Sequence, residues 1–97
     1  MKAVMIFYNQ ALTERVEYIL DLLSIKGFSR WEDVQGRGSE TGIPHMNTHT
    51  WPENNSSILT VIEDNTVPEL LEKIKKIDSL NEDVGIRAFV WNIEQSI

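Results

Sequence analysis

The sequence predicts a single α+β domain with the split element order β-α-β-β-α-β. Three observations lead to this prediction. The 97 residues fit one domain, four segments favour strands, and two further segments carry apolar residues at helical spacing. Such a chain forms a four-stranded antiparallel sheet with both helices on one face. We therefore expect residues 1–97 to form one domain.

The first half of the chain is predicted to contain a strand, a helix and a second strand. The apolar run KAVMIFY at residues 2–8 is rich in strand formers, and Asn9 follows it as a helix cap. Residues 28–35 are predicted to be the second strand, despite weak apolar alternation. Between them, apolar spacings of four, four and three predict an amphipathic helix that ends at Gly27, with Leu12, Val16, Leu20 and Leu23 on its inner face.

The second half has the same order of elements without repeating the sequence. The segment SILTVIE at residues 57–63 contains several β-branched residues and predicts a strand. Residues 66–69, TVPE, have the form of a capping box with proline near the first helical position, so a helix is expected to begin there. After a turn at 81–85, residues 86–94 alternate and predict the last strand. The inner face of the second helix is marked by Val67, Leu70, Leu71, Ile74 and Ile77.

These elements predict the ferredoxin-like arrangement, in which the helices cover only one face of the sheet. On the last strand, Phe89, Trp91 and Ile93 lie on one side, and Ile86 and Val90 lie on the other. Apolar residues therefore occur on both faces, and the most direct cover for the second face is another copy of the same chain. We predict a closed ring of identical subunits, which would also protect the sheet edges.

Composition argues against several classes of protein. The net charge is −6, and the basic cluster Lys73, Lys75 and Lys76 lies late in a predicted helix, so no nucleic-acid partner is expected. The sequence contains no cysteine, which excludes disulfides and thiolate chemistry. No segment approaches the roughly 20 apolar residues that span a bilayer, and no signal peptide is recognisable, so a cytoplasmic location is expected. No nucleophile with a base partner stands out, so we do not expect an enzyme.

A long segment at about residues 36–56 separates the second and third predicted strands. A hairpin link in a compact domain usually has about two to five residues, and much longer links are commonly functional or disordered. This segment is not of low complexity, because it contains glycines, prolines, histidines and a tryptophan. We therefore expect at least part of it to adopt a definite shape and to serve a function.

At this point the chain resembles the PII signalling proteins. The resemblance rests on the element order, the chain length, the KGF sequence at 26–28, and VQGRG at 34–38 followed by SETG at 39–42. In that family a strand leads into Val-x-Gly-x-Gly and then into a long functional loop. Before the last strand, however, the chain has LNEDVGIR at 80–87 in place of the family's Thr-Gly-x-x-Gly-Asp-Gly-Lys. We interpret it as a divergent member of the nitrogen regulatory protein PII superfamily.

The resemblance implies a homotrimer that senses a small anionic ligand, with an adenine nucleotide as one candidate. It also implies contact with a regulated partner protein, such as a transporter or an enzyme, through the 36–56 loop. Glycines let backbone N–H groups approach phosphate oxygens, and arginine adds a bidentate charged partner. The candidate ligand-binding residues are therefore Gly36, Arg37, Gly38 and Arg87.

Structural roles for these residues stay open. Gly36 and Gly38 would also allow a sharp exit from the strand, with or without a bulge. Arg37 is close enough in sequence to pair with Glu40. Arg87 could instead pair with an acidic residue at a subunit boundary.

His45 and His49 support an alternative hypothesis, a metal-binding or metal-efflux accessory protein. Two imidazoles four residues apart share a face when they are helical, and a loop can also bring them together. Glu40 or Glu53 would then be a third ligand for a divalent metal. The bland alternative is that both histidines hydrogen-bond the loop backbone or lie in water. The sequence thus establishes no cofactor, and it leaves an adenine nucleotide and a divalent metal as candidates.

Overall fold

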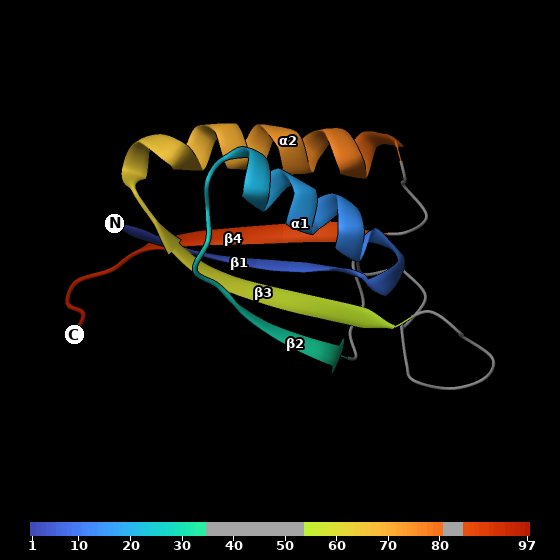
Figure 1. Cartoon of the computed structure of the whole chain (residues 1–97), viewed down its shortest axis with the longest axis horizontal. Helices are drawn as coiled ribbons and strands as arrows, with labels where there is room; N and C mark the ends of the chain where they lie inside the picture. Colours follow the sequence, from blue (N-terminus) through green and yellow to red (C-terminus); the bar gives the residue numbers. More distant parts are fainter. Residues whose placement is uncertain (35–53, 81–84) are drawn as a thin grey trace.

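The computed structural model describes residues 1–34, 54–80 and 85–97, apart from the side chains of residues 78–80. Two helices cover one face of a four-stranded antiparallel sheet, and none of the described elements covers the other face (Figure 1). The strand order is β2-β3-β1-β4, which confirms the ferredoxin-like prediction. The elements are β1 Lys2–Asn9, η1 Gln10–Leu12, α1 Thr13–Leu22, β2 Ser29–Val34, β3 Asn55–Ile62, η2 Asp64–Thr66, α2 Val67–Leu80 and β4 Ile86–Asn92. Within these residues, neither helix is long and apolar enough to cross a bilayer.

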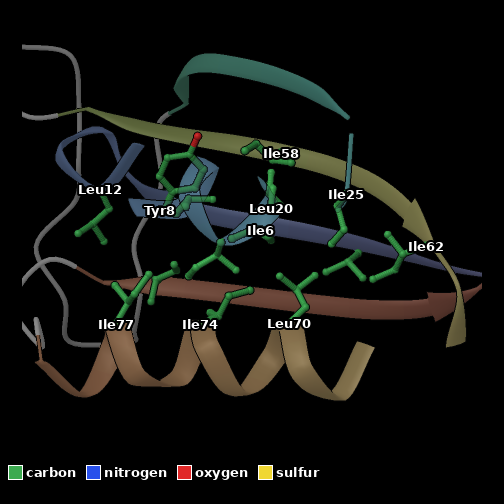
Figure 2. Close-up of a cluster of buried hydrophobic side chains, with 14 of the residues drawn as sticks. Ile6, Tyr8, Leu12, Leu20, Ile25, Ile58, Ile62, Leu70, Ile74 and Ile77 are labelled. Atoms are coloured by element: carbon green, nitrogen blue, oxygen red, sulfur yellow. The ribbon is translucent and has the colours of Figure 1, made fainter. Parts of the chain in front are cut away.

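The hydrophobic core lies between the helices and the sheet (Figure 2). Alternate residues of each strand point into it, as the pleat of a strand requires. Burying one large aliphatic side chain contributes about 1.5–3 kcal/mol to the free energy of unfolding, so this layer supplies much of the stability of the fold. The buried apolar residues include Val4, Ile6 and Tyr8 of β1, Ile58 and Ile62 of β3, Ile86 of β4, Val16 and Leu20 of α1, and Leu70, Ile74 and Ile77 of α2.

The first helix ends earlier than predicted. α1 stops at Leu22, and the left-handed residue that follows it is Ser24, with φ 60°, rather than Gly27. The Ile25 amide donates to the Leu20 carbonyl oxygen at 2.8 Å, and the Ser24 amide donates to that of Asp21 at 3.0 Å. This is the Schellman pattern, in which a left-handed residue closes the helix with two reversed hydrogen bonds. The prediction failed because serine occupies a position that usually favours glycine.

The remaining boundaries lie within two residues of the predictions. The Asn9 side chain accepts a hydrogen bond from the Ala11 amide at 2.9 Å, so it caps the short helix that precedes α1. β3 begins at Asn55, two residues before the predicted start, and β4 ends at Asn92 rather than at 94. α2 begins at Val67 as predicted, although the Thr66 hydroxyl contacts the Asn65 side chain at 3.4 Å instead of closing a capping box.

Replacing Ser24 with glycine is expected to stabilise the domain. A non-glycine residue in the left-handed region carries a steric penalty of about 1 kcal/mol that glycine avoids, and Ser24 is exposed, so little packing is lost. We expect the free energy of unfolding of Ser24→Gly, measured by urea denaturation, to rise by about 0.5–1 kcal/mol. Ser24→Ala, which keeps the penalty, is the control, and equal stability of the two variants would contradict this explanation.

Candidate functional site: the uncovered sheet face and the loop base

The face of the sheet opposite the helices is apolar and exposed. Cross-strand pairing places Leu59 and Phe89 on either side of Met5, and Val61 and Trp91 on either side of Ala3. Several large side chains in this region are about half exposed, namely Trp31 at 47%, Val61 at 43%, Phe89 at 56% and Trp91 at 47%. A contiguous apolar patch of this kind usually marks an interaction surface. We call this surface the uncovered face and define it by Met5, Phe7, Trp31, Leu59, Val61, Phe89 and Trp91.

Arg87 is a predicted ligand-binding residue that lies within the described part of the chain. It is exposed on β4, and its neighbour across the sheet is Phe7. The Phe7 and Phe89 rings meet edge to face, with centroids 6.2 Å apart. The Arg87 guanidinium donates a hydrogen bond to the Ile86 carbonyl oxygen at 2.8 Å. Strand alternation therefore puts the positive charge of Arg87 on the same side as this aromatic pair.

The other predicted site residues lie outside the described residues. These are Gly36, Arg37, Gly38, His45 and His49. The ligand role of the first three and the metal role of the two histidines therefore stay predictions. In the described ranges, no group of three histidine, aspartate or glutamate side chains is arranged to hold a metal ion.

The two ends of the long connection are joined by a side-chain hydrogen bond that the sequence did not predict. The Asn54 amide nitrogen donates to the Asp33 carboxylate at 3.0 Å, next to the backbone pair formed by Val34 and Asn55. The pairing register of β2 shifts between Trp31 and Val34, and Asp33 has φ 58°. Such a shift is a bulge, which bends a strand and redirects the chain beyond it. We call the pair Asp33 and Asn54 the loop base, because residues 35–53 begin and end there.

The bulge explains why residues 28–35 showed weak alternation. An extra residue in a strand changes the side to which the following side chains point, so a period-two pattern cannot continue through it. Aspartate tolerates the left-handed region better than most residues, which fits its place at this point. The irregular SRWEDV pattern was the sequence signal for the bulge.

The chain matches the family model "Nitrogen regulatory protein P-II" over residues 1–97. CPII from Thiomonas intermedia K12, a nitrogen regulatory PII-like protein bound to ADP, AMP and bicarbonate, has a similar fold. That alignment has a TM-score of 0.76 and 20% identity, and it covers 95% of this chain and 84% of the other. CPII bound to ADP, AMP and acetate gives 0.74 and 22% over the same shares. A PII-like signalling protein from Thermus thermophilus gives 0.66 and 18%, covering 95% and 85%. No curated protein matches the sequence.

Changing Asn54 to aspartate is expected to destabilise the loop base. The variant would face the Asp33 carboxylate with a second carboxylate and would lose the amide donor. We expect the free energy of unfolding at neutral pH to fall by about 1–3 kcal/mol, since a lost hydrogen bond to a charged group is joined by repulsion. The loss should shrink on acidification, because protonation of either carboxyl removes the repulsion.

The matched control is Asn65→Asp in the exposed helix η2. It adds the same charge away from the loop base. A pH-independent loss for Asn54→Asp, or an equal loss for both variants in urea titrations, would contradict this account.

Proposed function

Because this chain belongs to the nitrogen regulatory protein P-II family, we propose that it is a signal-transduction protein and not an enzyme. It assembles as a homotrimer, senses a small anionic ligand and contacts a regulated partner protein through the 36–56 loop. The single observation that carries this proposal is the family match over the whole of residues 1–97. The ligand considered first is an adenine nucleotide, and bicarbonate is the second anion to be tested.

The uncovered face supports the assembly step. Phe89, Trp91 and Trp31 leave about half of their surface in contact with water in the single chain. Burial of one such side chain contributes about 1.5–3 kcal/mol, so identical subunits that pack these faces together gain considerable free energy. A closed ring is favoured over an open array because it leaves no face uncovered and protects the sheet edges.

The neighbouring structures support the choice of ligand. The CPII structures are described as bound to ADP and AMP together with bicarbonate or acetate, and those ligands belong to that protein. In this chain, Arg87 places a guanidinium beside the aromatic pair on the uncovered face, and Arg37 lies between two glycines. Guanidinium groups and glycine amides are suited to phosphate and carboxylate oxygens.

The loop base supports the signalling step. Asp33 and Asn54 join the two ends of the long connection, so the 36–56 loop starts from a fixed frame. A ligand that contacts Gly36, Arg37 and Gly38 would bias the loop toward one arrangement. The partner would then recognise that arrangement, as in other switches in which a ligand orders a segment.

The assembly is tested by placing a charge on the uncovered face. We expect the native protein to sediment with three times the 11.2 kDa mass of the chain. Phe89→Glu should sediment as a monomer, because a carboxylate buried between subunits without a partner is strongly unfavourable. Tyr18→Glu is the matched control, since Tyr18 is 65% exposed on α1 and lies on the other side of the sheet. A folded native monomer, or dissociation of both variants, would refute the trimer.

Ligand sensing is tested by isothermal titration with ADP, AMP, ATP and bicarbonate separately. We expect at least one of these anions to bind. Arg37→Ala and Arg87→Ala should each weaken its binding by about tenfold or more, because a charge-assisted hydrogen bond contributes about 1.5–3 kcal/mol. Lys75→Ala removes an exposed positive charge on α2 and should leave the affinity unchanged. No binding heat with any of the four anions would contradict the proposal.

A further inference from the structure

A polar cleft lies on the helix side of the sheet, between the beginning of α1 and the edge strand β2. It has a volume of about 320 Å³, and its lining residues are Gln10, Ala11, Thr13, Glu14, Arg30, Glu32 and Ser56. A water molecule in the liquid takes up about 30 Å³, so the cleft has room for a small organic group. Arg30 and Glu32 alternate with Trp31 along β2, so this cleft and the uncovered face lie on opposite sides of the sheet.

The Tyr8 hydroxyl is buried at the inner side of this cleft. Tyr8 is 1% exposed, and it pairs across β1 and β3 with Ser56, which lines the cleft. Figure 2 shows its hydroxyl oxygen directed away from α2 and toward β3. Among the described residues this hydroxyl has no hydrogen-bond partner, and the nearby Thr13 hydroxyl donates to the Gln10 carbonyl oxygen at 2.7 Å. Buried polar groups almost always have a partner, so the Tyr8 hydroxyl points to a bound polar group.

The ionisation of Tyr8 fits this position. Burial raises the pKa of the Tyr8 hydroxyl, while the nearby Thr13 hydroxyl and Arg30 guanidinium act in the opposite direction. The raised pKa keeps the hydroxyl protonated at neutral pH. It then offers one donor and two acceptor lone pairs toward the cleft.

The charges around the cleft select the sign of that group. The Arg30 guanidinium forms ion pairs with Glu17 and, at 3.6 Å, with Glu32, so two carboxylates already surround it. Glu14 adds a third carboxylate from the first turn of α1. The partial positive charge at the beginning of a helix offsets only part of this negative excess. An anion is therefore disfavoured here, and a cation is attracted.

We propose that this cleft binds a cationic amine. Its ammonium group donates hydrogen bonds to the Glu14 and Glu32 carboxylates, and the hydroxyl oxygens of Tyr8 and Ser56 are further acceptors. An ammonium carries three donors and no acceptor, which suits a site rich in oxygen atoms. The amine is either a free metabolite or a lysine side chain of a partner protein. This site is separate from the anion-sensing function proposed above.

The test follows backbone amide NMR signals of the full chain at constant ionic strength. The probes are 1,4-diaminobutane and the peptide acetyl-Gly-Lys-Gly-amide. Their uncharged counterparts are 1,4-butanediol and the same peptide with glutamine. We expect the amine probes to shift the signals of Thr13 and Ser56, and the uncharged ones to leave them in place. Stronger binding of the diamine identifies a free amine as the source, and stronger binding of the peptide identifies a lysine side chain.

Variants of the cleft test the assignment of residues. Glu32→Gln should weaken amine binding by about tenfold or more, and Tyr8→Phe by about threefold or more. Glu32→Gln changes an exposed strand residue, so it tests the site even where Tyr8→Phe affects folding. Glu69→Gln removes an exposed carboxylate on α2 and should have no effect. The proposal is overturned by no shift with either amine, equal shifts with the diol, or equal weakening by Glu69→Gln and Glu32→Gln.

Discussion

The apolar character of β1 on both of its sides constrains the whole molecule. β1 lies between β3 and β4, and its residues Val4, Ile6 and Tyr8 pack under the helices. Its alternate residues Met5 and Phe7 face the other way, where none of the described elements covers them. A central strand with two apolar sides needs two covers, and the described chain supplies one. The helices, the uncovered face and the need for a second molecule all follow from this single strand.

Apolar periodicity was enough to predict the fold, because the core depends on it directly. The inner residues Leu70, Ile74 and Ile77 of α2 and the alternation of β4 were readable from spacing alone. The end of α1 was not, since a left-handed serine satisfies the same two reversed hydrogen bonds as glycine once Ile25 is held in the core. Local propensity loses to tertiary packing at such positions.

The site was only partly predictable, for a related physical reason. Arg87 could be proposed because its face follows from strand alternation, which is a local property. The contact of Asp33 with Asn54 joins residues 21 positions apart, and it depends on a bulge that no spacing rule located. The Tyr8 cleft was also missed. In the sequence Tyr8 is one more apolar strand residue, and its neighbours Thr13, Arg30 and Ser56 meet only when α1 and β2 fold over the sheet.

β2 is the strand through which these features are connected. β1 is held on both sides by continuous pairing with β3 and β4, so a small ligand cannot shift it without breaking two ladders. β2 is an edge strand with a register shift and one neighbour, so its displacement breaks far fewer hydrogen bonds. It carries Arg30 and Glu32 toward the cleft and Trp31 toward the uncovered face, and it leads into the loop base. A change in charge pairing at Arg30 would therefore be transmitted through β2 more readily than through any central strand.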